Sequence, residues 1–448
     1  MPRAARYNPS LEKAETLAGV LVEARRPLTR SDLSEALGLP VDKATLCRWI
    51  HLALEEKMIS RNGLARAAIY EPTPEFRAQF NSRRLAAPVT RRPRVGYERE
   101  FLLDYVPNKS SYLGETRLAA LHRKCPIGSS PTNEMDERGL TSFMADLAYS
   151  SSKLEGNTYS YKAMLKLVDE GVEASGHDPE EAAMLLNHYE AAGFLARNIA
   201  YPPRDGDPSI TRFEICSLHT MLSFNLLPDP RRCGQIRVDR VEIGESAYIP
   251  LSGGADLAFC FEKALAKAAA INDPYEQAMF LLVHLPYLQA FDDCNKRTAR
   301  VACSIPLLRA GVVPMSWHDT KGEEFIEGIL SVYEYNDTYK LAEVFSEGYA
   351  RSAERFALAY RPVKPSMIAM LYRKQVRKAI SDVVAGDDLC VPDSVKPTDA
   401  GEFLLHVTTH LDALRENSEL AAAYGLSKPE IQAWCDSDSV STQRDRQR

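Results

Sequence analysis

The stretch Tyr287-Leu-Gln-Ala-Phe-Asp-Asp-Cys-Asn-Lys-Arg-Thr-Ala-Arg300 is the most informative part of the 448-residue chain. Its pattern predicts a helix that ends near Gln289, a polar turn over residues 292–295, and a second helix that begins near Lys296. The first turn of a helix presents free backbone N–H groups and a partial positive charge, which together attract phosphate. These features predict a turn that binds an anion between two helices.

The side chains around this turn suit a nucleotide. Arg297 and Arg300 are three residues apart, so both are expected near the beginning of the second helix on adjacent faces. Two carboxylates precede that helix, and one of them can hold Mg²⁺ bound to a polyphosphate. An ordinary helix start with an Asp or Asn cap and surface arginines has the same pattern, so these residues alone leave both interpretations open.

The first 72 residues predict three helices followed by a hairpin. The helices are expected at Leu11–Arg26, at Arg30–Leu37 after the cap Thr29, and from Asp42 to about Lys57. Asn62-Gly63 between two β-prone runs predicts the hairpin turn. This order resembles a winged helix-turn-helix domain, whose third helix is the recognition helix.

Polar and basic side chains on this segment suit double-stranded DNA. Residues 1–100 contain 18 Lys/Arg and 12 Asp/Glu, so their net charge is +6. The net charge of the whole chain is −6, so the remaining residues carry −12. The candidate contacts on the third helix and the hairpin are Lys43, Thr45, Arg48, Arg61 and Arg66. Such a domain also serves in protein contacts or dimerisation, and the sequence leaves open a homodimer.

The rest of the chain divides into three regions. Residues 73–115 are rich in Arg and Pro and predict an extended linker. Residues 116–360 predict a helical domain interrupted by a β-hairpin at Gln235–Pro250, and residues 361–448 a further helical domain with a polar tail. The helices expected in the large domain include Glu134–Ser151, Tyr161–Gly171, Pro179–Ile199, Thr211–Leu222, Ala255–Asn272 and Pro274–Gln289. The predicted fold class is mainly α.

Composition excludes several classes of protein. No apolar run approaches the roughly 18 residues of a transmembrane helix, and the first residues lack the apolar core of a signal peptide. Nine cysteines are scattered without a Cys-x-x-Cys pair, which argues against a disulfide framework and a zinc site. We therefore expect a cytoplasmic protein without a membrane partner.

The stretch that ends at Arg300 resembles the Fic/Doc (Fido) signature, His-x-Phe-x-(Asp/Glu)-(Gly/Ala)-Asn-(Gly/Lys)-Arg-x-x-Arg. The matching positions are Phe291, Asp293, Asn295, Lys296, Arg297 and Arg300. The resemblance implies a helical Fido core that binds ATP or another nucleotide. It implies that Asp293 holds the metal, Mg²⁺, that Asn295, Lys296 and Arg297 form the anion pocket, and that Arg300 contacts the terminal phosphate.

Two further segments agree with this resemblance. Ser151-Ser-Lys-Leu-Glu155-Gly is similar to the family's inhibitory motif, (Ser/Thr)-x-x-x-Glu-(Gly/Asn), which implies that Glu155 pairs with Arg300 and blocks placement of the γ-phosphate. A carboxylate and a phosphate compete for the same guanidinium fork, so such a pair acts as a switch. The segment from Gly234 to Pro250 is similar to the family's flap, in which Tyr248 and Ile249 lie at the edge that docks a protein target by strand addition.

The signature departs from the family pattern at its first position. Gln289 occupies the place of the histidine that takes the proton from the target hydroxyl, and an amide orients a hydroxyl but accepts no proton at neutral pH. His284 lies five residues earlier and is expected to pack in the core. Cys294 replaces a small residue, and Lys296 is the variant found in Doc, which transfers phosphate.

Three functions remain open. The first is transfer of AMP from ATP to a hydroxyl of a protein target, with Gln289 at the catalytic position and Glu155 as inhibitor. The second is an inactive nucleotide sensor that regulates DNA binding through the N-terminal domain. The third is a Doc-like protein kinase, which Lys296 favours and Arg300 disfavours.

Overall fold

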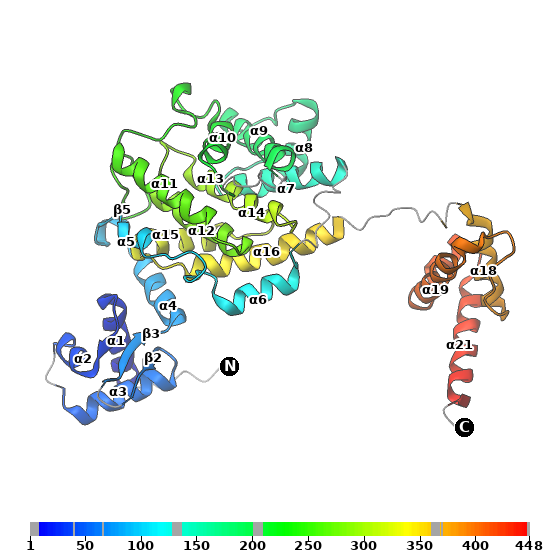
Figure 1. Cartoon of the computed structure of the whole chain (residues 1–448), viewed down its shortest axis with the longest axis horizontal. Helices are drawn as coiled ribbons and strands as arrows, with labels where there is room; N and C mark the ends of the chain where they lie inside the picture. Colours follow the sequence, from blue (N-terminus) through cyan, green and yellow to red (C-terminus); the bar gives the residue numbers. More distant parts are fainter. Residues whose placement is uncertain are drawn as a thin grey trace. The chain divides into compact units, whose positions relative to one another are not determined.

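A computed structural model describes residues 9–38, 41–64, 67–127, 137–199, 209–359, 368 and 371–445. These residues are mostly helical (Figure 1). The mainly α fold class is thus confirmed. The backbone contacts divide the chain into two compact units, residues 1–360 and residues 361–448. No helix within the described ranges is long and apolar enough to cross a membrane.

The N-terminal part of the first unit has three helices and a three-stranded antiparallel sheet. The elements are α1 (Pro9–Ala24), β1 (Leu28–Thr29), α2 (Arg30–Ala36), α3 (Lys43–Glu55), β2 (Ile59–Asn62) and β3 (Ile69–Pro72). The strand order is β1-β3-β2. Thr29 and Asp32 form a capping box that begins α2, and Asp42 caps α3, as these residue types favour. The expected helices and hairpin are present; the winged-helix assignment stays a prediction.

The expected extended linker at residues 73–115 is wrong. This region contains α4 (Pro74–Leu85), a 3₁₀ turn (Val89–Arg91), β4 (Val95–Gly96) and α5 (Arg99–Leu103), and α6 (Gly114–Lys124) begins at its end. Thr73 caps α4 and Pro74 occupies its first turn. Buried Asn81 donates a 2.9 Å hydrogen bond to Asp337. Contact with a segment far along the chain therefore overrides the polar, Arg-rich composition.

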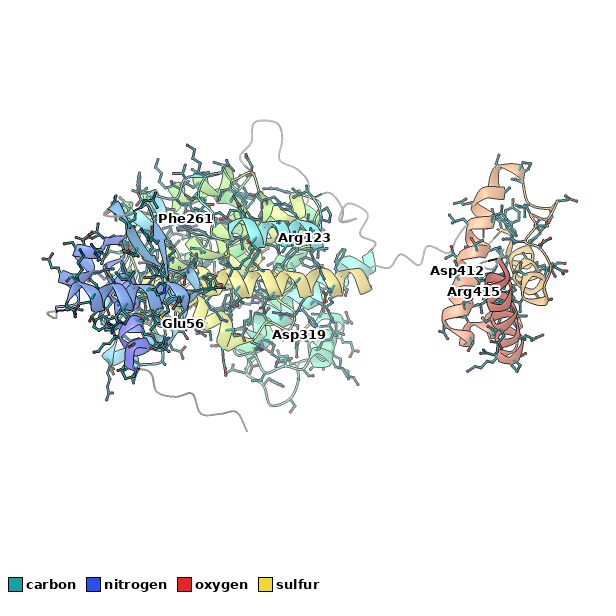
Figure 2. The ribbon with its side chains drawn as sticks, turned by 90° about the horizontal axis from the view of Figure 1, so that it is seen from below. Glu56, Arg123, Phe261, Asp319, Asp412 and Arg415 are labelled. Atoms are coloured by element: carbon teal, nitrogen blue, oxygen red, sulfur yellow. The ribbon has the colours of Figure 1, made fainter. Side chains whose placement is uncertain are left out.

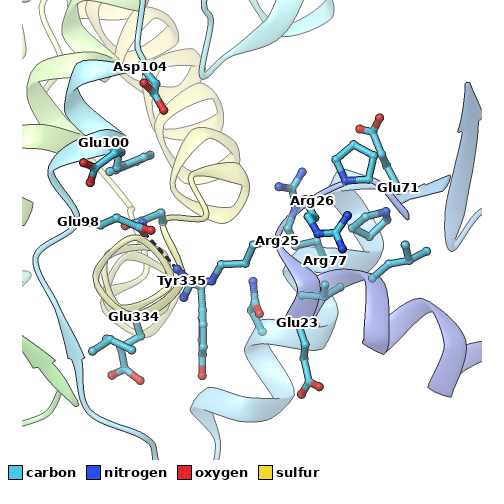
Figure 3. A pocket seen from close by; sticks show the side chains of 18 of the residues that line it. Glu23, Arg25, Arg26, Glu71, Arg77, Glu98, Glu100, Asp104, Glu334 and Tyr335 are labelled. Atoms are coloured by element: carbon cyan, nitrogen blue, oxygen red, sulfur yellow. Dashed lines mark hydrogen bonds and ion pairs between the residues drawn. The ribbon is translucent and has the colours of Figure 1, made fainter. Parts of the chain in front are cut away.

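Charged side chains face each other across a cavity of about 740 Å³ beside α4. Arg25, Arg26 and Arg77 lie on one side, and Glu98 and Glu100 lie on the other (Figure 3). Arg25 and Glu98 form an ion pair of 3.1 Å between exposed side chains, a class of contact that stabilises weakly.

The central part of the first unit is built around α12 (Pro274–Leu288), of which every residue is buried. This helix contacts α11 (Ala255–Ala269), α13 (Asn295–Ala302), α14 (Ser304–Arg309) and α15 (Gly322–Tyr335) (Figure 1). The remaining elements are α7 (Glu137–Lys153), α8 (Tyr161–Glu170), α9 (Pro179–Phe194), a π turn (Leu195–Ile199), α10 (Arg212–Ser223), a 3₁₀ turn (Pro230–Arg232) and α16 (Tyr339–Ala359). The site described below lies at the end of α12 and the beginning of α13.

The β-hairpin expected at Gln235–Pro250 is wrong. The segment has one short strand, β5 (Tyr248–Ile249), which pairs in parallel with β4. The apolar alternation misleads here, because the Arg237 side chain is buried while Val238 is 64% exposed. Arg237 donates to the backbone carbonyls of Gln289, Asp239 and Leu251. These bonds hold the segment as an irregular loop.

The second unit has its own core of apolar side chains. Its elements are α18 (Arg373–Ala385), a 3₁₀ turn (Pro397–Asp399), α19 (Ala400–Glu416), a 3₁₀ turn (Ser418–Leu420), α20 (Ala421–Tyr424) and α21 (Lys428–Asp445). Asp412 and Arg415, both on α19, form an exposed ion pair of 3.1 Å (Figure 2).

Candidate nucleotide-binding site

The turn between α12 and α13 is built from two left-handed residues. Gln289 ends α12 at φ 49°, and Cys294 precedes α13 at φ 58°. Residues with a bulky side chain rarely adopt this backbone conformation, which explains why a small residue suits the position of Cys294. Asn295 closes the turn, because its Oδ1 accepts from the backbone N–H of Phe291 at 2.9 Å and its Nδ2 donates to the carbonyl of Phe291 at 2.8 Å.

Arg300 is completely buried and contacts α7. Its Nη1 lies 2.7 Å from Oε1 of Glu155, and its Nε and Nη2 each donate a 3.0 Å hydrogen bond to Ser151. Lys296 Nζ lies 3.4 Å from the other oxygen of Glu155. The structure therefore brings Glu155, Arg300 and Lys296 together from segments that are about 140 residues apart in the sequence, with the carboxylate between the two cations.

The charges around Glu155 keep it ionised. Burial by itself raises the pKa of Glu155, but attraction to Arg300, Lys296 and Arg297 outweighs burial and lowers the pKa to about 2. Burial lowers the pKa of the Arg300 guanidinium, and Glu155 opposes that change. At neutral pH both groups are charged, so a phosphate must displace a strong ion pair to reach Arg300.

Gln289 is held by three hydrogen bonds. Its Nε2 donates to the carbonyl of Pro286 at 3.0 Å and to the Tyr333 hydroxyl at 2.9 Å. Its Oε1 accepts from Asn295 Nδ2 at 3.0 Å. Both amide protons are used, so the remaining lone pair of Oε1 is the group with which Gln289 can orient a hydroxyl.

A cavity of about 270 Å³ lies beside these residues. Gln289, Asn295 and Lys296 line one side, and residues 241–245 and Tyr333 line others. Glu155 lines the cavity whereas Arg300 does not. Glu155 thus lies between Arg300, which is predicted to contact the terminal phosphate, and the cavity that a nucleotide would enter.

Asp293 can serve a metal ion as one carboxylate ligand. Its side chain is 64% exposed, one oxygen accepts from the backbone N–H of Cys294, and the other lies 2.9 Å from Arg297 Nη2. Among the described residues there is no group of three or more His, Cys, Asp or Glu side chains that could hold a metal. One carboxylate is enough where phosphates supply further oxygens, so this donor fits Mg²⁺ on a polyphosphate.

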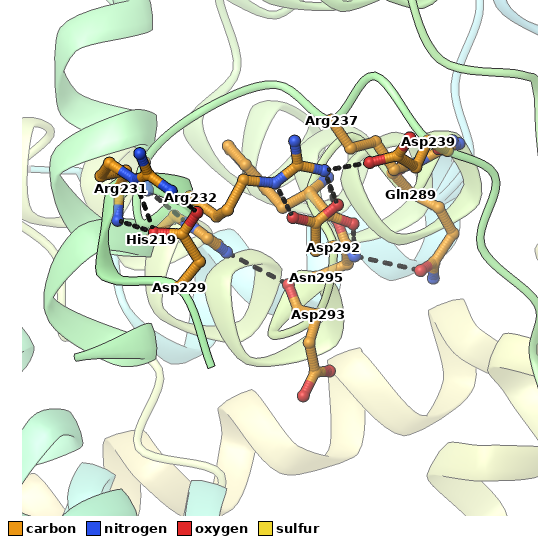
Figure 4. Close-up of polar contacts among 12 residues, drawn as sticks. His219, Asp229, Arg231, Arg232, Arg237, Asp239, Gln289, Asp292, Asp293 and Asn295 are labelled. Carbon is orange, nitrogen blue, oxygen red and sulfur yellow. Dashed lines mark hydrogen bonds and ion pairs between the residues drawn. The ribbon is translucent and has the colours of Figure 1, made fainter. Parts of the chain in front are cut away.

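The neighbouring Asp292 forms an ion pair with Arg232. Arg232 donates from Nε and Nη2 to both oxygens of Asp292 at 2.6 and 2.9 Å, and also contacts Asp239 (Figure 4). Figure 4 also shows His219, whose Nε2 lies 3.1 Å from the carbonyl of Asp293. Both carboxylates line the cavity, but they differ in their contacts. Asp292 is held by Arg232 at both oxygens, whereas Asp293 is the more exposed of the two.

The sequence pattern missed several residues of this site. Tyr333 lies on α15, far from the signature in the sequence, and no motif marks it. His188 is fully buried behind Arg300, within 3.0 Å of Ser151 Oγ, and burial lowers its pKa to about 3. His284 is confirmed as a packing residue, because it is 2% exposed and bonds the Tyr112 hydroxyl at 2.7 Å.

The remaining candidate residues that the structure describes do not line the cavity. Lys43, Arg48 and Arg61 are exposed, Thr45 is half-buried, and Arg66 falls outside the described residues. Ile249 is 45% exposed. Tyr248 is buried, its ring stacks on Tyr287 and Tyr333, and its hydroxyl donates to the carbonyl of Tyr287.

Solved structures of several Fic proteins are similar to this chain at low identity. Residues 134–508 of Fic-1 from C. elegans are 18% identical, with a TM-score of 0.43, over 79% of this chain and 89% of that one. A Fic family protein from Desulfovibrio desulfuricans is 14% identical, with a TM-score of 0.44, over 73% and 89% of the two chains. A Fic domain containing signaling protein from Bacteroides thetaiotaomicron is 19% identical, with a TM-score of 0.42, over 54% and 97%.

No curated protein matches the chain at a significant level. Residues 209–307 match the Fic/DOC family, and this region contains the turn, both signature arginines and Asp293. The match covers α10, α11, α12 and α13 in full, including the turn at which the signature residues meet. On this evidence residues 209–307 match the Fic/DOC family, and they include the turn that the signature describes.

Proposed function

We propose that this protein binds ATP at the α12–α13 turn and transfers AMP slowly to a hydroxyl of a protein target, with Glu155 holding the site closed. The observation that carries the proposal is the contact of Glu155 with Arg300 and Lys296 at the edge of the cavity. A protein with no use for a terminal phosphate would gain little from two cations covered by one buried carboxylate.

The proposed chemistry depends on positioning. The beginning of α13 and Arg297 attract the phosphates, and Asn295 keeps the turn closed. Bound at Asp293, Mg²⁺ would supply charge neutralisation of the polyphosphate. The free lone pair of Gln289 Oε1 accepts from the target hydroxyl and orients it. The hydroxyl oxygen attacks the α-phosphorus of ATP, pyrophosphate leaves, and the proton passes to water. Transfer is expected to be slow because Gln289 does not take that proton.

The test compares α-labelled and γ-labelled ATP. The Glu155→Gly variant is incubated with Mg²⁺ and cell lysate, and Glu155→Gly combined with Arg300→Ala is the matched control. Labelling of protein from the α position alone supports AMP transfer. Labelling from the γ position alone supports a kinase instead, and absence of both labels contradicts transfer.

A second function is favoured by the N-terminal elements. Lys43 and Arg48 are exposed on α3, which begins at a well-formed cap and packs its apolar face in the core of this segment. We propose for this part a nucleotide-responsive regulator that binds double-stranded DNA. Binding of the full chain to duplex DNA, weakened by salt and by Lys43→Ala with Arg48→Ala, is the expected result. Binding that these substitutions leave unchanged contradicts it.

A further inference from the structure

The last residues of α15 connect two parts of the first unit. Tyr333 lines the cavity and bonds Gln289, whereas the next residue, Glu334, turns toward residues 245–247. Both side chains are almost completely buried, at 3% exposure each. One helix end therefore contacts both the catalytic position and the loop that precedes β5.

A single carboxylate oxygen of Glu334 collects three donors. Oε1 accepts from Arg92 Nη1 at 2.6 Å, from Ser246 Oγ at 2.8 Å, and from the backbone N–H of Ala247 at 3.0 Å. Arg92 in turn donates from Nη2 to the carbonyl of Glu245 at 2.9 Å. The carboxylate and the guanidinium thus hold the backbone on both sides of Ser246.

The backbone that they hold continues directly into the cavity wall. Residues 241–245 line the cavity, and they form no helix or strand. Their position depends on side-chain contacts and on the short pairing of β5 with β4. An irregular segment of this kind is placed by its anchors, since no ladder of backbone bonds defines it.

The ion pair is poorly suited to a purely stabilising role. Arg92 Nε is buried and lacks a hydrogen-bond partner among the described residues, which costs stability. Two apolar side chains of similar size often stabilise a core as well as a buried ion pair does. What apolar side chains cannot replace is the set of directional bonds to residues 245–247.

We propose that Glu334 is a positioning residue of the nucleotide site, which together with Arg92 holds the wall formed by residues 241–245 against the cavity. For its effect on the nucleotide, this inference rests on the proposed function. Arg92 follows α4 in the sequence, so the wall is anchored to the region that joins the N-terminal elements to the site.

The experiment separates positioning from stability. Glu334→Met, Arg92→Met and the double variant are made in the Glu155→Gly protein. Each single variant leaves a buried charge unpaired and loses stability, and the double variant recovers most of that loss. Hydrogen exchange at residues 241–248 is measured without nucleotide, and ATP affinity is measured by titration with Mg²⁺ present.

In the double variant we expect exchange at residues 241–248 to be about tenfold faster and ATP affinity to be about tenfold weaker, despite the recovered stability. The control is Glu214→Gln with Arg309→Met, which removes an ion pair outside the cavity and should leave both readouts unchanged.

Three outcomes are distinguishable. Unchanged exchange in the double variant overturns the anchoring role of Glu334 whatever the nucleotide does. Faster exchange with unchanged ATP affinity overturns the link between the wall and the nucleotide site. If the Glu155→Gly parent binds no ATP, the proposed function is wrong, and the exchange measurement still decides whether Glu334 anchors the segment.

Discussion

The α12–α13 turn and the segment from Gln235 to Pro250 border the same cavity, but they are stabilised in different ways. The turn is closed mostly by residues a few positions apart, such as Asn295 with Phe291 and Arg297 with Asp293. The segment is held by distant residues, including Arg92 and Glu334. Local contacts make the turn recognisable in the sequence, whereas distant contacts hide the conformation of the segment.

The largest effect that we predict comes from a substitution in the turn. Gln289→His in the Glu155→Gly protein should raise the rate of AMP transfer by about 10²–10⁴-fold, because imidazole can take the proton from the hydroxyl. The rate is measured with α-labelled ATP, and Gln289→Asn is the control that keeps an amide. A folded histidine variant that is no faster would show that position 289 does not limit transfer.

A substitution in the segment should act on stability instead. Arg237→Met leaves three carbonyls without their donor, so the free energy of unfolding should fall by about 3 kcal/mol. Exposed Val238→Thr is the neighbouring control and should change it by less than about 0.5 kcal/mol. Urea denaturation measures the free energy of unfolding of both variants. Equal losses in the two variants would contradict the view that buried Arg237, and not exposed Val238, holds the segment.

Opening the site should have a smaller effect, on nucleotide affinity. Glu155→Gly frees Arg300 and Lys296, and ATP should bind about tenfold more tightly, since charge-assisted contacts to phosphate become available. Titration with ATP checks this, and exposed Glu173→Gly controls for loss of a surface carboxylate. Tighter binding by both variants would point to general electrostatics rather than to the pair.

The last effect that we predict should appear in acid. Because the folded protein lowers the pKa of Glu155 from 4.5 to about 2, its ionised form contributes stability that is fully present above about pH 4.5. That contribution is lost as the pH falls from 4.5 toward 2. The difference in unfolding free energy between the parent and Glu155→Gln should shrink over this window, and a constant difference would mean that Glu155 does not titrate as described.

The sequence by itself determined the helical class, the helix starts marked by Thr29 and Asp42, and the turn with its signature residues. These features depend on caps and spacings that lie within a few residues of each other. The same locality explains why the resemblance to the signature could be recognised at Asn295 and Arg297.

Only the tertiary structure decided how the site is completed. It places Tyr333 against Gln289, Glu155 over Arg300, and Arg237 inside the loop that the apolar alternation predicted as a strand. Each of these contacts joins residues that are distant in the chain. Their formation depends on how the helices pack around α12, and no short-range pattern records that packing.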